Sequence, residues 1–469
     1  MPADPLAATA DARSRSTVAR RQNPPDAPRR FLFIMHGPLS LLFQRRFGPF
    51  FITQFLGAFN DNLFKNALIV LLTFRTAEWT TLSPGLLANL AAGLFILPFF
   101  IFSATAGQLA DKYDKVRLAR VVKLLEMGIM ALAAIGFVLK ALPWLLAALF
   151  LLGLHSTLFG PVKYAILPQH LPPEALIAGN ALVEAGTFIA ILTGTLAGAL
   201  LAGSIDAPVW IAIAGFAVAL AGYLASRQVP AAAPSAPGIT VHLNPLTETV
   251  HNLALLRQHP ALAIAMIGLS WFWLYGALFL TQFPIYAQTV LGGDAHAVTL
   301  LLATFTVGIG AGSLLCERLS GPRLRPGLVA PGALGLSLAA LDLWFASPAP
   351  AAQATPLPLA ALLVEPAVWR VLADLLLLGL CGGLFTVPLY AQLQIHSPAT
   401  CRARLIAANN ILNALFMVVG ALAAAALLGQ GWSIPALFAL AAGANAAVAA
   451  FMCWHEPAYR WCIRAGQQR

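Results

Sequence analysis

The stretch GLHSTLFGPVKYAILPQHLP, from Gly153 to Pro172, has a second version in GLCGGLFTVPLYAQLQIHSP, from Gly379 to Pro398. The offset between them is a constant 226 positions, and nine of the twenty aligned residues are identical. Identities this dense at equivalent places of one chain indicate a duplicated structural unit. We therefore predict two halves built on one plan, an arrangement that can enclose a site between them.

Long apolar segments lie on both sides of this repeat. Of the 469 residues, 59% are hydrophobic and 10% are charged, whereas an ordinary soluble domain is about 25% charged. A helix of about 20 apolar residues crosses the ~30 Å of hydrocarbon in a bilayer. We predict an all-α membrane protein with twelve transmembrane helices in two six-helix pseudo-repeats. The spans are 47–74, 84–110, 118–140, 142–167, 175–203, 207–227, 261–291, 297–316, 327–347, 369–394, 403–429 and 432–455.

The longest loop separates the two halves. It begins with the Pro/Ala-rich stretch QVPAAAPSAPG and continues into LTETVHNLALLRQHP, which predicts a short amphipathic helix on the membrane surface. The predicted organisation is a basic cytoplasmic tail (1–46), an N-terminal six-helix bundle (47–227), a cytoplasmic linker with the amphipathic helix (228–260), a C-terminal six-helix bundle (261–455) and a second cytoplasmic tail (456–469).

The Lys and Arg residues are distributed unequally between the two sides of the membrane that the predicted spans define. If the N-terminus is cytoplasmic, 23 of the 28 Lys and Arg residues fall in cytoplasmic tails, loops or loop edges. Only Arg75, Lys140 and Arg370 fall on the opposite side, and Lys65 and Lys163 fall inside spans. This asymmetry follows the positive-inside rule and predicts that both termini are cytoplasmic. The net charge of +10 is thereby explained, and no nucleic-acid partner is expected because no aromatic-interleaved basic face exists.

The first span carries charges in its middle. In AFNDNLFKN (58–66), Asp61 and Lys65 are four residues apart, and Asn62 lies beside the face they share. An ionisable group at membrane depth costs at least ~2.5 kcal/mol, and it usually faces a cavity. Two interpretations stay open: a polar wall of a central substrate cavity, or a self-neutralised pair that tolerates burial.

Lys163 is a second charge inside a span. Its counterpart in the repeat is Leu389, so the duplicated fold does not itself require a lysine. Beside the helix irregularity that Pro161 introduces, its ammonium can meet a phosphate, or it can snorkel to the cytoplasmic surface. Glu184 can pair with Lys163 or line the cavity, and Asn180 extends the same face. The candidate substrate-binding residues are Asp61, Asn62, Lys65, Lys163, Asn180 and Glu184.

The loop after the second span, GQLADKYDKVRLAR (107–120), has a different character. Gly107 allows close helix approach, and Asp111 can cap or pair with a neighbouring helix end. Lys112 and Arg117 hold the loop at the cytoplasmic face. We expect these four residues to serve conformational switching rather than substrate chemistry.

Five motifs in this order resemble the bacterial lysophospholipid transporter family of the major facilitator superfamily. They are QFLGAFNDNLFKNAL, AGQLAD, FGPVKYAILP, GNALVEAGTFIAILTGTLAG and GGLFTVPLYAQLQ. GQLADKYDKVR is similar to the superfamily's loop motif, with Asp114 where a glycine is usual. The resemblance covers about 47–455. It extends to the transporter module of proteins in which that module is fused to an acyltransferase and an acyl-carrier-protein ligase.

This resemblance implies a major facilitator fold that moves lysophospholipids, such as lysophosphatidylethanolamine, inward across the bacterial inner membrane for reacylation. Alternating access is the implied mechanism, and a separate acyltransferase/acyl-carrier-protein ligase is the implied partner. Asp61 and Lys163 are implied as polar cavity residues, and Glu184 matches by motif. A cation found in the seventh helix of some members has no match in this chain, but WFWLYGALFL (271–280) offers an aromatic, apolar surface for an acyl chain.

Two other functions stay open. One is an exporter of small amphiphilic drugs or metabolites, and the other is a non-transporting membrane partner that docks an acyltransferase. The H-x-x-x-x-D, Walker, G-x-S-x-G and H-E-x-x-H motifs are absent from the sequence, and the five cysteines lack ligand spacing. We therefore expect no enzyme activity, no cofactor and no metal. Whether an ion gradient or reacylation drives transport also stays open.

Overall fold

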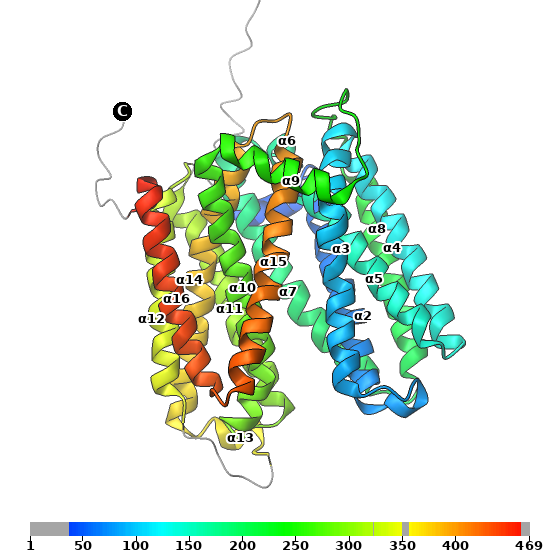
Figure 1. Cartoon of the computed structure of the whole chain (residues 1–469), viewed down its shortest axis with the longest axis vertical. Helices are drawn as coiled ribbons and strands as arrows, with labels where there is room; N and C mark the ends of the chain where they lie inside the picture. The colour runs from blue at the N-terminus through cyan, green and yellow to red at the C-terminus, as the bar shows by residue number, and fades with distance from the viewer. Residues whose placement is uncertain (1–36, 322, 349–355, 461–469) are drawn as a thin grey trace, which may run out of the picture.

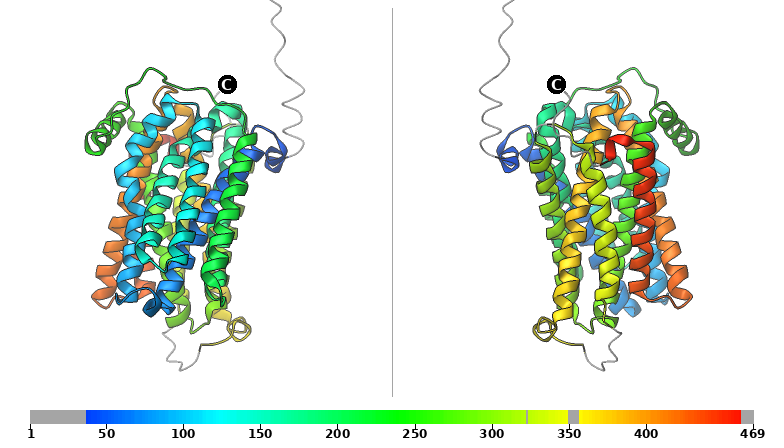
Figure 2. Two further views of the ribbon diagram at one scale, coloured as in Figure 1. Left: turned by 90° about the vertical axis from the view of Figure 1, so that its right-hand side faces the viewer. Right: turned by 90° about the vertical axis from the view of Figure 1, so that its left-hand side faces the viewer.

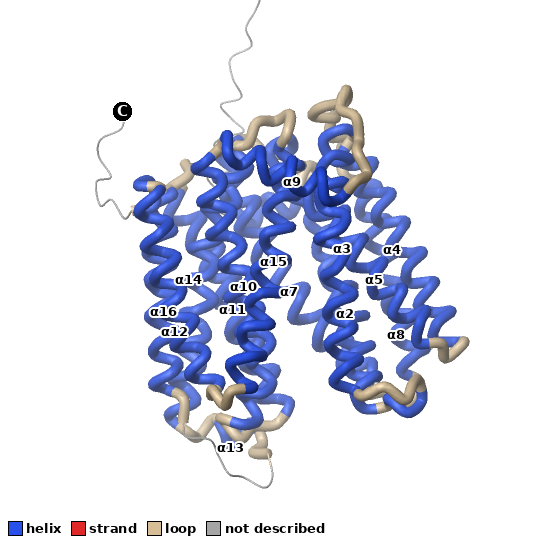
Figure 3. Tube along the Cα trace, in the orientation of Figure 1, coloured by secondary structure: helices blue, strands red, loops and turns tan. Residues whose placement is uncertain are grey.

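The computed structural model describes residues 37–321, 323–348 and 356–460, and these residues are mostly helical (Figure 1). Helices and loops make up this part of the chain, and no strand occurs in it (Figure 3). Most of the predicted basic tail (1–36) and residues 461–469 of the second tail lie outside the described residues. The long helices are α2 (Gly48–Phe74), α3 (Pro84–Lys112), α4 (Lys115–Val138), α5 (Leu142–Ala165), α7 (Leu176–Ala202), α8 (Ala207–Gln228), α10 (Pro260–Thr289), α11 (Ala295–Ser320), α12 (Val329–Ala346), α14 (Pro366–His396), α15 (Arg402–Gly429) and α16 (Ile434–His455).

These helices confirm the predicted fold class. Each predicted span agrees with one long helix to within four residues at either end. Among the described residues, eleven helices are long and apolar enough to cross a membrane, and α2 is the long helix that falls outside this set. The polar stretch 58–66 lies in the middle of α2, where Asn60, Asp61 and Asn62 are buried. Packing against protein rather than lipid explains how α2 tolerates this polarity.

The helices pair in the same way in both halves. In the N-terminal half, α2 packs on α7, α3 on α5 and α4 on α8. The equivalent pairs in the C-terminal half are α10 with α15, α11 with α14 and α12 with α16. The two principal contacts between the halves, α7 with α11 and α3 with α15, are also equivalent to each other. This repeated pairing is the structural counterpart of the sequence repeat.

Two equivalent tyrosines of the repeat meet where the halves join. Tyr164 of α5 and Tyr390 of α14 are 226 positions apart. Their rings stack with centroids 4.3 Å apart and an angle of 6° between the planes. Both side chains are buried. The repeat therefore places one ring from each copy at the boundary between the two halves.

Glycines set the distance between α2 and α7. A Cβ added to Gly194 would meet the carbonyl oxygen of Phe59, and one added to Gly198 would meet that of Leu63. The G-x-x-x-G pattern thus lets the two backbones touch. As a result, α2 is held tightly against α7.

One end of the bundle carries the linker between the halves, and we call it the linker end; the opposite end is the far end. At the linker end, α9 (Pro245–Leu255) lies beside α3 and α15 (Figures 1 and 2). Glu248 of α9 is buried and accepts a hydrogen bond from Gln108 Nε2 at 3.0 Å. Leu246 and Val250, in contrast, are exposed. The helix therefore docks through its polar side and leaves its apolar side uncovered.

Candidate functional site

Asp61 belongs to α2, and its carboxylate faces α5. The Ser156 hydroxyl donates a hydrogen bond to Asp61 Oδ2, and His155 Nδ1 is 3.7 Å from Asp61 Oδ1. The carboxylate is largely enclosed, with 11% of the Asp61 side chain exposed. Its partners come from the neighbouring helix, so the self-neutralised Asp61–Lys65 pair that the sequence left open does not form among the described residues.

Lys65 and Asn62 form a separate group one turn along α2. Lys65 Nζ donates to Asn62 Oδ1 at 3.1 Å and lies 5.1 Å from the centroid of the Phe95 ring. Asn62 uses its own amide group to donate to the Ala58 carbonyl of the same helix at 2.8 Å. The lysine is half-buried, so it keeps part of its surface available to a ligand.

Lys163 is held near the linker end of α5. Its ammonium donates to Thr187 Oγ1 of α7 at 2.7 Å, and Thr187 Oγ1 lies 3.2 Å from Gln54 Oε1 of α2. An ammonium has three donors, and the described residues provide no carboxylate partner for it. The arrangement leaves donor capacity on Lys163 for an anionic ligand.

These contacts build two polar levels between α2 and α5. Gln54 and Asp61 are seven residues apart on α2, and Ser156 and Lys163 are seven residues apart on α5. Seven residues are about two helical turns, or ~10.5 Å. Asp61 with Ser156 forms the level nearer the far end. Lys163, joined to Gln54 through Thr187 of α7, forms the level nearer the linker end. An acid and a base are thus separated by about the height of two turns.

Glu184 does not pair directly with Lys163 among the described residues. Instead, Glu184 Oε1 accepts a hydrogen bond from the Tyr164 hydroxyl at 2.7 Å, in a fully buried setting. Tyr164 stacks on Tyr390, whose hydroxyl accepts from Trp273 Nε1 at 2.9 Å. Glu184 is therefore connected to the boundary between the halves.

Asn180 lies in the contact between the halves rather than beside the other candidates. Its amide and that of Gln394 in α14 exchange two hydrogen bonds, both 2.8 Å long. Both side chains are fully buried. Nothing in the sequence signals this pair, because its members are 214 positions apart and belong to different halves.

The predicted switch residues lie at the linker end. Asp111 accepts hydrogen bonds from the backbone amides of Ala403 and Arg404 at 3.1 and 3.3 Å, and from Arg404 Nε at 3.2 Å. Its carboxylate therefore sits at the N-terminus of α15, where the helix dipole favours an anion. A Cβ on Gly107 would lie 2.9 Å from the Arg404 Cα, so the backbones of α3 and α15 touch here.

Lys112 and Arg117 make fewer contacts than Asp111. Lys112 is half-buried beside the Tyr113 ring, and Arg117 is exposed. Asp114, which departs from the usual glycine, caps α4 by accepting from the amides of Val116 and Arg117 at 2.9 Å each. The departure therefore has a local structural role.

The aromatic stretch 271–280 is less open than the sequence suggested. Phe272, Tyr275 and Phe279 are buried in the C-terminal half, where Phe279 stacks on Phe438. Trp273 is only half-buried, and it stacks on Phe188 of the other half. A single stretch of helix cannot expose all its aromatics, because they point in different directions around the axis.

Sequence analysis missed a buried charge cluster in the N-terminal half. Lys123, one of the 23 basic residues counted in cytoplasmic tails, loops or loop edges, lies inside α4 and is fully buried. Its ammonium donates to Glu126 Oε2 at 2.7 Å. Asn60 Nδ2 donates to Glu126 Oε1 at 2.8 Å, and His155 Nε2 lies 3.3 Å from Glu126 Oε2. The available signal was a lysine and a glutamate three residues apart at the start of an apolar span.

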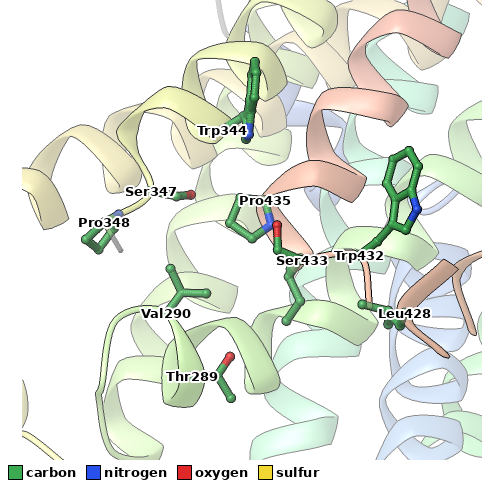
Figure 4. A pocket seen from close by; sticks show the side chains of 10 residues that line it. Thr289, Val290, Trp344, Ser347, Pro348, Leu428, Trp432, Ser433 and Pro435 are labelled. Carbon is green, nitrogen blue, oxygen red and sulfur yellow. The ribbon is translucent and has the colours of Figure 1, made fainter. Parts of the chain in front are cut away.

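A cavity of about 410 Å³ opens at the far end of the C-terminal half (Figure 4). It lies between Trp344 and Trp432, with Ser347 and Ser433 also on its wall. No ionisable side chain lines it. Indole rings at this height are typical of a membrane–water interface, and none of the candidate substrate residues contributes to this cavity.

Comparisons with known proteins identify relatives over most of the chain. Residues 50–364 match the family model described as Major Facilitator Superfamily. The lysophospholipid transporter LplT of Escherichia coli K12 is 30% identical over 406 residues, which cover 83% of this chain and 92% of that protein. LplT of Escherichia fergusonii is 29% identical with the same coverage.

Solved structures with the same architecture are more distant in sequence. The transporter FucP in its outward conformation has a TM-score of 0.66 and 13% identity, and the match covers 88% of this chain and 100% of that one. The human organic anion transporter MFSD10 has a TM-score of 0.66 and 16% identity, with 86% and 99% of the two chains covered. At these identities the likeness concerns the fold alone.

Proposed function

The chain belongs to the lysophospholipid transporter family of the major facilitator superfamily, and we propose that this multi-pass membrane transporter carries lysophospholipids inward across the bacterial inner membrane. The observation that carries the proposal is the pair of polar levels between α2 and α5. They offer a lysine ammonium that donates to a neutral hydroxyl at one level and a carboxylate at the other. The named relatives are lysophospholipid transporters, which supports the same substrate class.

A lysophospholipid with an ethanolamine headgroup suits these two levels. Its phosphate can accept from the ammonium of Lys163, because a charge-assisted hydrogen bond of this kind is strong. Its ammonium can donate to Asp61, and Lys65 provides a second cation one turn away. The half-buried Trp273 offers apolar surface between the halves for the acyl chain. Reacylation by a separate acyltransferase/acyl-carrier-protein ligase would then remove the product on the inner side.

Alternating access supplies the mechanism of the proposal. The hydrogen bonds that join the two bundles, at Asp111–Arg404 and Asn180–Gln394, belong to the linker-end half of the helices. We assign the linker end to the cytoplasm, where the basic loops predict it. In this conformation the site would then be closed to the cytoplasm and would take its substrate from the outer side.

The direct test of the proposal uses purified protein in vesicles. A fluorescent lysophosphatidylethanolamine is placed in the outer leaflet, and a membrane-impermeant quencher reports how much has moved inside. We expect faster inward movement with the wild-type protein than in protein-free vesicles. Equal rates, with the protein folded and correctly inserted, would contradict the proposal.

The Asn180–Gln394 pair leads to a prediction about gating. Replacing Asn180 by alanine leaves the buried Gln394 amide without partners, which costs about 1–3 kcal/mol in the closed state. We expect this loss to shift the protein by roughly 5- to 150-fold toward conformations open at the linker end. A cysteine introduced at the buried Val387 can react with maleimide only when the linker end opens. Its labelling rate therefore measures the shift.

The double variant Asn180→Leu/Gln394→Leu is the matched control. Replacing both partners by apolar groups is close to neutral, so labelling at Val387→Cys should return toward the parent rate. If Asn180→Ala labels at the same rate as the parent, the pair does not hold the linker end closed.

A further inference from the structure

Three asparagines that the lysolipid site described above does not use lie close together on α15: Asn409, Asn410 and Asn413. An asparagine amide carries both donors and acceptors, and leaving such groups unpaired inside a protein is costly. The Ser270 hydroxyl of α10 donates to Asn413 Oδ1 at 2.8 Å. Asn409 and Asn410, in contrast, have no hydrogen-bond partner among the described residues. Each of these two amides therefore needs an explanation.

The sequence repeat accounts for Asn409. LIAGNALVEA (176–185) of α7 and LIAANNILNA (405–414) of α15 share five of ten residues at an offset of 229, and α7 and α15 hold equivalent places in the pairing of the two halves. Asn409 is then the counterpart of Asn180. The glutamine that pairs with Asn180 has Pro168 as its own counterpart, and a proline side chain cannot hydrogen-bond. Asn409 is thus a repeated residue whose partner the first half lacks.

Asn410 is different, because the repeat does not require it. Its counterpart is Ala181, which is fully buried, so the duplicated fold accommodates a small apolar side chain there. The same comparison distinguished Lys163, whose counterpart is Leu389. Asn410 is 9% exposed, whereas Asn409 is completely enclosed. Of the two unpaired amides, Asn410 is therefore the one that a ligand can reach.

Asn410 reaches across the boundary between the halves to the helix that carries Lys163. A Cβ added to Gly160 of α5 would lie 2.4 Å from Asn410 Nδ2, so the amide rests directly on the α5 backbone. Gly160 and Lys163 are three residues apart, which makes them neighbours on the surface of one helix, with about 5–6 Å between Cβ positions. When a phosphate meets Lys163, we expect the atoms next to that phosphate to lie beside Asn410.

A lysophospholipid has a free hydroxyl close to its phosphate. One glycerol carbon carries the phosphate and the next carries the hydroxyl, which is replaced by an ester in a two-chain phospholipid. A hydroxyl both donates and accepts hydrogen bonds, and so does the amide of Asn410, whereas an ester has no donor. We propose that Asn410 binds this free hydroxyl and thereby selects one-chain over two-chain lipids. The inference rests on the proposed function, because it concerns the same substrate at the same site.

Competition binding tests this inference without any need for transport. Full-length protein in detergent micelles binds a fluorescent lysophosphatidylethanolamine, which is displaced by unlabelled lysophosphatidylethanolamine or by its deoxy analogue, with hydrogen in place of the glycerol hydroxyl. The ethanolamine headgroup has no hydroxyl, so any difference reports the glycerol alone. A hydrogen bond between neutral groups corresponds to about 2- to 10-fold in affinity. We expect the deoxy analogue to compete more weakly by this factor.

Two variants assign the difference to one side chain. Asn410→Leu keeps nearly the same shape without the amide, and it should bind the hydroxyl and deoxy compounds equally well. Asn409→Leu is the matched control, because Asn409 is the adjacent asparagine but is completely enclosed, and it should keep the wild-type ratio. If Asn410→Leu does not fold, Asn410→Ala takes its place, since alanine is accepted at the equivalent position 181.

The outcomes separate this inference from the proposed function. Equal competition by the two compounds with the wild type overturns the inference, and so does a ratio that survives in Asn410→Leu or disappears in Asn409→Leu. If the wild type binds with the expected ratio but moves no lysolipid in vesicles, the proposed function fails and the inference holds. If it moves lysolipid without preferring the hydroxyl compound, only the inference fails. A wild type that neither binds nor moves lysolipid contradicts both.

Discussion

Replacing Lys163 by alanine is expected to lower the rate of lysophospholipid transport by about 10- to 100-fold. The reason is the loss of a charge-assisted hydrogen bond to the phosphate, worth about 1.5–3 kcal/mol, where each 1.4 kcal/mol is a factor of ten. Among the described residues the ammonium of Lys163 donates to Thr187 and lies 5.1 Å from the centroid of the Tyr164 ring; both groups are neutral, so a phosphate would still be the anion that meets this charge directly. Uptake of labelled lysophosphatidylethanolamine at normal expression measures the effect.

The structure also explains why this variant should fold. The equivalent position in the other half is Leu389, which is fully buried, so the repeat accommodates an apolar side chain there. Lys163→Met keeps the length of the side chain without its charge and should behave like Lys163→Ala. Lys140→Ala removes an exposed lysine and should have no effect on uptake. Unchanged transport in Lys163→Ala would remove this residue from the site.

Replacing Lys123 by alanine is expected to destabilise the protein by about 3–5 kcal/mol, the usual cost of removing one partner from a buried ion pair. Glu126 would keep its charge in a fully enclosed position, with Asn60 and His155 as its remaining partners. The free energy of unfolding in mixed detergent micelles, or the thermal midpoint in one detergent, measures the loss.

A double variant distinguishes the ion pair from simple packing. Replacing a buried pair by apolar residues of similar volume is often neutral or stabilising. Lys123→Met/Glu126→Leu should therefore recover most of the stability that Lys123→Ala loses. If Lys123→Ala is as stable as the wild type, the pair is not a structural element of this bundle.

Much of the fold can be predicted from the sequence because its signals are local. Hydrophobic length marks each span without any knowledge of its neighbours, and the repeat at an offset of 226 shows that the halves are related. α2 is the instructive case. Its polar stretch keeps it outside the helices that qualify by composition, yet the apolar residues on both sides and its place in the first half still identify it as a span.

The partners of the polar residues cannot be predicted in this way. They depend on the rotation of each helix about its axis and on which helices touch. Asp61 was considered with Lys65 on the same helix, but its contacts are Ser156 and His155 on α5. Asn180 was considered a binding residue by its face on one helix, and the structure places it against Gln394 of the other half. In both cases the deciding contact joins distant parts of the chain.

The role of each candidate residue remains a proposal, and Lys163 has the strongest case. The comparison of the two repeats identified it as the lysine that the fold does not need, and the structure leaves its ammonium with donor capacity. In the buried cluster, the same comparison sets His155 against Cys381, whereas Lys123 and Glu126 lie outside the repeated stretch. A histidine inside an apolar span was a usable signal for it, but the carboxylates that surround this ring come from two other helices.

The measurement that tests the central claim most directly is uptake of labelled lysophosphatidylethanolamine by spheroplasts that lack their own lysolipid transporter. Wild-type protein, Lys163→Ala and Asp61→Ala are compared at equal expression. We expect uptake with the wild type and loss in both variants. Absence of uptake with folded wild-type protein would contradict the account, and resistance of the same cells to amphiphilic drugs would then favour an exporter.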